Sequence, residues 1–201
     1  KHRNEMVAHV YDTTYEVVRK KKDTIVVIDD SIVRGTTLEK SILTMLDKLE
    51  PKRIIVVSSA PQIRYPDCYG IDMSKMHDFI AFRALLALLE EQGKNKLLKE
   101  VFKKCRKNIK QPAEKQKNYV RELYKEFSYQ EISDKIAQII KGEHVKASVS
   151  VVYQTVDNLH EACPNNKGDW YFSGNYPTPG GNRVVNQSFI NYIENNNKRA
   201  Y

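Results

Sequence analysis

The sequence predicts an α/β fold built on part of a doubly wound parallel sheet. Two short segments, 24–29 (TIVVID) and 53–59 (RIIVVSS), consist mostly of apolar and β-branched residues, a pattern typical of strands buried inside such a sheet. Between them, apolar residues recur at helical spacing from Leu38 to Leu49, and Pro51 follows. A strand, a helix and a second strand in this order predict a parallel crossover.

The other elements follow from the same patterns, over 201 residues that suffice for one domain with a substantial core. Ahead of the first strand, residues 5–22 are expected to form a helix ending in a basic run. Further helices are expected at 76–91, 94–108, 114–127 and 130–141, with a third strand at 148–155. The chain is expected to end in an ordered aromatic loop from residue 163 and a short helix near 187–194.

Composition narrows the class of protein. The net charge is +8, but the lysines of residues 94–141 alternate with glutamates, as on solvated helix faces, so no nucleic-acid partner is expected. No apolar run approaches the ~18 residues of a membrane span, and no secretory signal is visible. The three cysteines are far apart, which argues against a disulfide framework or zinc site. We therefore expect a cytoplasmic protein without a membrane partner.

Polar residues follow the first predicted strand, at the end where open α/β sheets bind ligands. The carboxylates of Asp29 and Asp30 suit sugar hydroxyls or a divalent cation. Gly35 would let a ligand approach closely, and Thr36 or Thr37 could cap a helix whose free N–H groups suit a phosphate. A ribose 5-phosphate would suit both groups, with its hydroxyls at the carboxylates and its phosphate at the N–H groups. The alternative is a solvated turn with two surface acids.

The segment VVIDDSIVRGTT resembles the phosphoribosyl pyrophosphate (PRPP) motif of type I phosphoribosyltransferases, in the form found in glutamine PRPP amidotransferases, or amidophosphoribosyltransferases. Residues 58–73, SSAPQIRYPDCYGIDM, resemble the same family, and FSGNYPT at 172–178 does so more weakly. The resemblance implies the C-terminal part of a type I phosphoribosyltransferase domain. Its PRPP-binding part would be residues 1–75, followed by a helical insertion at 76–145. Residues 146–201 would close the domain with a strand and an aromatic loop.

The resemblance also implies an activity. The family transfers glutamine-derived ammonia to PRPP, with Mg²⁺, to give phosphoribosylamine and pyrophosphate in the first step of purine synthesis. We expect a glutaminase domain in the same full-length chain, regulation by purine nucleotides, a homo-oligomer, and no activity from these residues alone. Two alternatives remain open: a salvage-type phosphoribosyltransferase, against which the YGID run argues, and a non-catalytic paralogue that senses PRPP or a nucleotide.

Site residues follow from the same resemblance. Asp29 and Asp30 match the family's catalytic ribose and metal carboxylates, and the 5-phosphate loop matches Ser31, Arg34, Gly35, Thr36 and Thr37. Three residues of the following loop could line the site or simply pack that loop: Arg64, Tyr69 and Asp72. Some relatives hold an iron–sulfur cluster partly through a C-x-x-C pair. Gly168 and Tyr171 stand at those positions here, so no cluster is expected.

Overall fold

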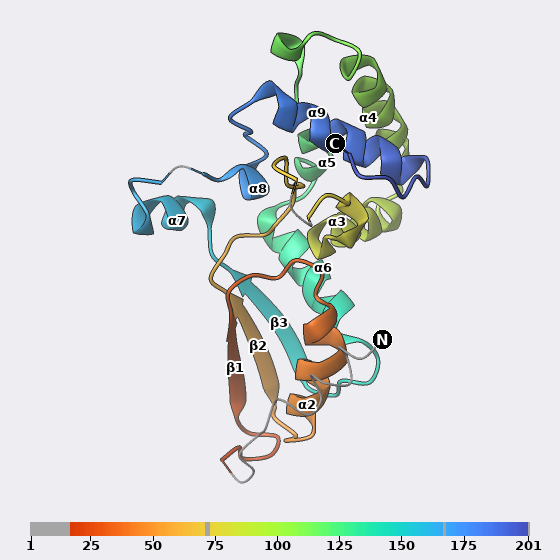
Figure 1. Cartoon of the computed structure of the whole chain (residues 1–201). Coiled ribbons are helices and arrows are strands. Elements are labelled where there is room, and N and C mark those ends of the chain that lie inside the picture. Colours follow the sequence, from red (N-terminus) through yellow and green to blue (C-terminus); the bar gives the residue numbers. More distant parts are fainter. Residues whose placement is uncertain (1–16, 71–72, 167, 201) are drawn as a thin grey trace.

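A computed structural model of the chain describes residues 17–70, 73–166 and 168–200. It confirms the α/β fold (Figure 1). The described residues form a parallel sheet of order β1-β2-β3, made of β1 (Thr24–Asp29), β2 (Arg53–Ser58) and β3 (Ser148–Tyr153). All three strands lie where the sequence predicts them, and the sheet is only part of a doubly wound one.

Helices cover one face of this sheet. The chain leaves β1 through a loop into a π-helical turn, η1 (Leu38–Ile42), which continues as α2 (Leu43–Asp47). The longer helix α6 (Tyr129–Lys141) contacts both β3 and η1. Ile54 and Val56 of β2 point to this side and are fully buried. The predicted helix at 38–49 is confirmed, with its end near Pro51.

The opposite face of the sheet is open in the described part of the chain. Val26 and Ile28 of β1 are 57% and 77% exposed, and Val152 of β3 is 51% exposed. In the register, Ile28 pairs with Val57, which pairs with Val152, so these side chains form one apolar row. On β2 itself, Ile55 and Val57 of this face are only partly buried. The expectation that β2 is buried on both faces is therefore wrong, because within the described residues helices pack against one face alone.

The remaining helices gather beyond one end of the sheet, where Figure 1 shows α6 running between the strands and this cluster. Among them, α3 packs on α6, and α4 packs on α9. Their bounds are η2 (Met76–Asp78), α3 (Ile80–Glu91), α4 (Asn95–Asn108), η3 (Ala113–Lys115), α5 (Arg121–Tyr124), α7 (Val156–Ala162), α8 (Trp170–Ser173) and α9 (Pro179–Ile193). No helix in the described ranges is long and apolar enough to cross a membrane.

One predicted helix is wrong for a clear physical reason. Residues 114–127 form only the short η3 and α5, because distant polar side chains bind the backbone between them. Asn108 Oδ1 accepts from Lys117 N at 3.0 Å, and Asn186 Nδ2 donates to Lys117 O at 2.8 Å. Asn186 Oδ1 accepts in turn from Tyr119 N. These bonds replace those that a continuous helix would make.

Other boundaries also differ from the predictions. Residues 17–22, the described end of the helix expected at 5–22, form a turn in which Lys21 has φ +57°; the rest of that helix lies outside the described residues. Ser128 starts α6 anew with a reciprocal capping box to Glu131, so the segment does not continue the previous helix. The last helix begins at Pro179, well before residue 187, since proline suits a first helical turn.

Candidate functional site

The loop that follows β1 is tied to the loop that follows β2. Ser59 N donates to Asp29 O at 2.9 Å, and Ala60 N donates to Asp30 O at 3.0 Å. The Ser59 hydroxyl donates to the same Asp30 carbonyl at 3.1 Å. These bonds fix the backbone of both aspartates at the carboxyl edge of the sheet, where ligands of open α/β sheets bind.

The two carboxylates lie close together, and Asp30 disfavours the charged form of Asp29. Asp29 Oδ1 accepts from Asp30 N at 3.0 Å, and Asp30 Oδ1 accepts from Ser31 N at 2.8 Å. Partial burial raises the pKa of Asp29, and the neighbouring Asp30 carboxyl raises it further. A hard cation would relieve this repulsion, and oxygen donors of this kind suit Mg²⁺. In the described ranges no third histidine, cysteine or acidic residue joins the pair to make a protein-only metal cluster.

Gly35 is required by packing as well as by conformation. Its φ is +71°, a value that side chains with a Cβ rarely adopt. A Cβ built there would lie 2.4 Å from Ile80 Cδ1 of α3 and 3.1 Å from Ile140 Cγ2 of α6. The missing side chain thus faces the helices, whereas the sequence suggested that the glycine leaves room for a ligand.

The helix after Gly35 begins with an ordinary open first turn. Glu39 N donates to Gly35 O at 2.9 Å, so the amides of Thr36, Thr37 and Leu38 precede the first intrahelical bond. Thr37 makes no side-chain capping bond, and the capping role suggested for it is wrong. Both threonines are exposed, whereas Leu38 is buried and anchors the turn. The open amides lie in the same loop as the carboxylates.

Arg34 is held by residues far along the chain. Its Nη2 donates to Asp78 Oδ2 at 3.0 Å, and its carbonyl accepts from Arg83 Nη2 at 2.7 Å. Ile80 N donates to Val33 O at 2.8 Å. The loop is therefore docked on η2 and the start of α3. Sequence reasoning missed Asp78 and Arg83, because no local pattern relates them to a loop more than forty residues away.

The three residues suggested as site-lining have different surroundings. Arg64 donates to Gln62 Oε1 and lies over the rings of Tyr124 and Tyr129, at 4.9 and 4.5 Å from their centroids. Tyr69 is exposed and meets Trp170 edge-on at 5.8 Å. Asp72 lies outside the described residues. For Arg64 and Tyr69 these contacts pack the loop, and their role in a site stays a prediction.

The aromatic loop near the C-terminus is packed around a buried acid. Tyr171 OH donates to Asp67 Oδ1 at 2.8 Å, and Asp67 is completely buried. Trp170 and Tyr171 lie 5.5 Å apart between ring centroids. Tyr171 stands at one of the positions where the resemblance places a cluster cysteine. Cys68, Cys105 and Cys163 are free.

Known proteins are similar to parts of this chain. A relative from Haemophilus influenzae is 43% identical over 79 residues, which is 39% of this chain and 15% of that protein. One from Pyrococcus horikoshii is 39% identical over 83 residues, covering 41% and 18%. One from Saccharomyces cerevisiae is 25% identical over 158 residues, covering 77% and 20%. All three are named amidophosphoribosyltransferase.

The chain resembles amidophosphoribosyltransferases. The resemblance inferred from the motifs is thereby confirmed at 39% identity or more over partial regions. The chain spans about a fifth or less of the length of these amidophosphoribosyltransferases. No model of a protein family matches the chain.

Proposed function

We propose that residues 29–37 bind the ribose 5-phosphate end of PRPP, or of a purine nucleotide, as part of an amidophosphoribosyltransferase. The supporting observation is that one loop carries two adjacent carboxylates and, a few residues later, an open helical first turn. The carboxylates suit the ribose hydroxyls, and the amides of Thr36 and Thr37 suit the phosphate. The names of the relatives agree with this assignment.

The proposed roles follow from these contacts. Asp29 and Asp30 would orient the ribose and hold magnesium, whose remaining ligands would be water and phosphate oxygens. Bound magnesium would supply positive charge against that of the departing pyrophosphate. The loop would keep the sugar fixed while ammonia attacks, and such positioning supplies a large part of the catalysis in reactions of this kind. Ser31, Arg34 and Gly35 would shape the loop, with Arg34 oriented by Asp78.

We further propose that the full-length enzyme uses glutamine through a separate domain and acts in purine synthesis as a homo-oligomer in the cytoplasm. Residues 1–75 would form the PRPP-binding part of the domain. Residues 76–145 would be a helical insertion, and residues 146–201 would close the domain. Contacts of β2 with β3, of α6 with η1 and of α6 with β3 support the view that these three parts fold as one unit.

A charge placed at the phosphate end tests the proposal. In Thr36→Glu, the added carboxylate should repel a bound phosphate but interact favourably with the helix N-terminus. The affinity for the nucleotide should therefore fall while the stability of the protein is retained. We expect isothermal titration with a purine nucleoside 5′-monophosphate to show at least a tenfold loss, about 1.4 kcal/mol. The melting temperature should not fall. Lys40→Gln, an exposed position one turn further along with the same charge change, is the control and should stay within twofold.

Two results would count against the assignment: no binding by the unchanged protein at millimolar nucleotide, or equal losses in both variants. An assay of the full-length protein with PRPP, magnesium and ammonia then separates an enzyme from a sensing paralogue. Turnover supports the transferase, whereas nucleotide binding without turnover favours the sensor.

A further inference from the structure

A basic pocket of about 720 Å³ lies at the amino-terminal ends of the strands, whereas the Asp29 loop lies at their carboxyl ends. Its walls come from the three segments that lead into the strands: Lys21 precedes β1, Lys52 precedes β2, and Lys146 precedes β3. The end of α2, with Thr44, Asp47 and Lys48, forms the remaining side. A strand of six residues separates the two edges by roughly 17–20 Å, so this pocket is separate from the proposed ribose 5-phosphate site.

The charges of the lining are unbalanced. Four lysines face two carboxylates, and both carboxylates already have partners. Asp47 Oδ1 accepts from Lys146 N at 3.0 Å and from Ala147 N at 2.8 Å. Glu50 pairs with Lys20, which lies outside the lining, at 2.5 Å. Asp47 keeps its charge while it holds the wall, and Glu50 is offset by Lys20, so the four lysines leave the lining with a net positive charge.

The backbone that presents these lysines is firmly held. Lys21 and Glu50 both have positive φ, +57° and +52°, and Lys21 N donates to Glu50 O at 2.6 Å. Strained backbone of this kind persists only where its surroundings enforce it, and it is common at functional sites. Asp47 fixes Lys146 in the same way through its two amide bonds.

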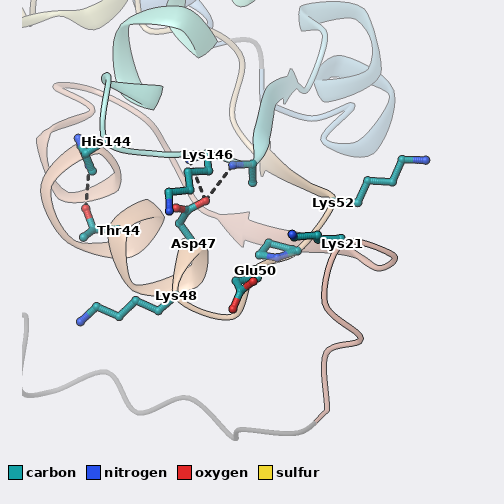
Figure 2. Close-up of a pocket in the computed structure, with 10 residues that line it drawn as sticks. Lys21, Thr44, Asp47, Lys48, Glu50, Lys52, His144 and Lys146 are labelled. Carbon is teal, nitrogen blue, oxygen red and sulfur yellow. Dashed lines mark hydrogen bonds between the residues drawn. The ribbon is translucent and has the colours of Figure 1, made fainter.

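Figure 2 shows how the side chains lie in this pocket. Lys21 extends inward above Glu50, and Lys146 bends toward Asp47, whereas Lys48 and Lys52 extend outward on opposite sides. His144 Nε2 lies 2.9 Å from the Thr44 hydroxyl. Two inner ammonium groups, with two more on long flexible stems at the rim, can surround an anion from several directions.

We propose that this pocket binds a polyphosphate, either free or as the phosphate chain of a nucleoside triphosphate. The pocket has the volume of small-molecule sites, which is more than a single phosphate needs. Several phosphates in a chain would engage the inner lysines, Lys21 and Lys146, and the outer ones together. The ligand class follows from the excess of ammonium groups over carboxylates in the lining.

Titration calorimetry of the chain with inorganic tripolyphosphate tests the proposal. Lys21→Gln combined with Lys146→Gln should weaken binding at least tenfold. The control, Lys96→Gln with Lys103→Gln on exposed positions of α4, removes the same charge and should change affinity less than twofold. All four positions are exposed, so neither variant should alter the melting temperature.

Three outcomes would overturn the proposal: no binding by the unchanged chain at millimolar tripolyphosphate, equal losses in pocket and control variants, or loss of binding in Thr36→Glu, which would place the anion at the other site. A parallel titration with ATP, carried out in the Thr36→Glu variant so that the proposed ribose 5-phosphate site contributes little, separates the two sources of the ligand. Affinities equal to that of tripolyphosphate identify free polyphosphate, and a tighter ATP complex identifies a nucleotide.

Discussion

Replacing Gly35 with alanine tests how the loop after β1 is held in place. The added Cβ would need φ near +71° and would lie 2.4 Å from Ile80 Cδ1, well inside van der Waals contact. The left-handed conformation costs about 1–2 kcal/mol, and overpacking a fully buried position costs about 1–3 kcal/mol. We therefore expect Gly35→Ala to lower the free energy of unfolding by about 2–5 kcal/mol, a large part of the total for a domain of this size.

A second substitution should recover part of this loss of stability. Ile80→Val removes the Cδ1 atom nearest to the new Cβ and by itself costs about 0.5–1.5 kcal/mol. In the double variant the steric part of the Gly35→Ala loss should disappear while the conformational part remains. Urea unfolding of the wild type, both single variants and the double variant gives the coupling energy, expected at about 1–3 kcal/mol in favour of the double variant. Additive losses, or a Gly35→Ala loss below about 0.5 kcal/mol, would refute the packing of this loop on α3.

Two further predictions concern α6 and the carboxylate pair. Ser128→Ala removes the accepting half of the capping box on α6 and should cost about 1 kcal/mol in urea unfolding; an unchanged midpoint would contradict the cap. Asp29→Asn should raise the melting temperature at pH 7, because burial and Asp30 raise the pKa of Asp29 and so penalise its charged form in the folded state. That penalty is present above the raised pKa and disappears as the pH falls toward the ordinary value of 3.8, so the gain should vanish near pH 4. A gain that persists there would have another cause.

The strands and the position of the loop after β1 could be predicted from sequence because their signals are local. A short apolar run such as Ile25–Ile28 indicates a buried strand. Two adjacent aspartates followed by a glycine and two threonines form a distinctive pattern, which indicates a polar loop leading into a helix. The carboxyl edge of the sheet then brings these residues to one place. Burial of the second face was predicted wrongly, since a sequence pattern does not say whether a covering layer is present.

What could not be predicted depends on partners far apart in the chain. Asn186 reaches the backbone of Lys117 and Tyr119 across nearly seventy positions, and this interrupts a segment whose own pattern is helical. Asp78 likewise accepts a hydrogen bond from the side chain of Arg34, which lies far away in the sequence. The basic pocket is formed by the three segments that precede the strands. The lysine of each segment cannot be told apart by sequence from the many other lysines of the chain.

The open face of the sheet has a thermodynamic consequence. Side chains such as Ile28 and Val152, which stay largely exposed on this face, contribute less to the apolar surface buried on folding than strand residues inside a covered sheet would. The heat-capacity increment of unfolding and the urea m-value both scale with that buried surface, so both should fall below the values usual for 201 residues. A partner that covers this row should therefore give a negative heat-capacity change of association in a calorimeter.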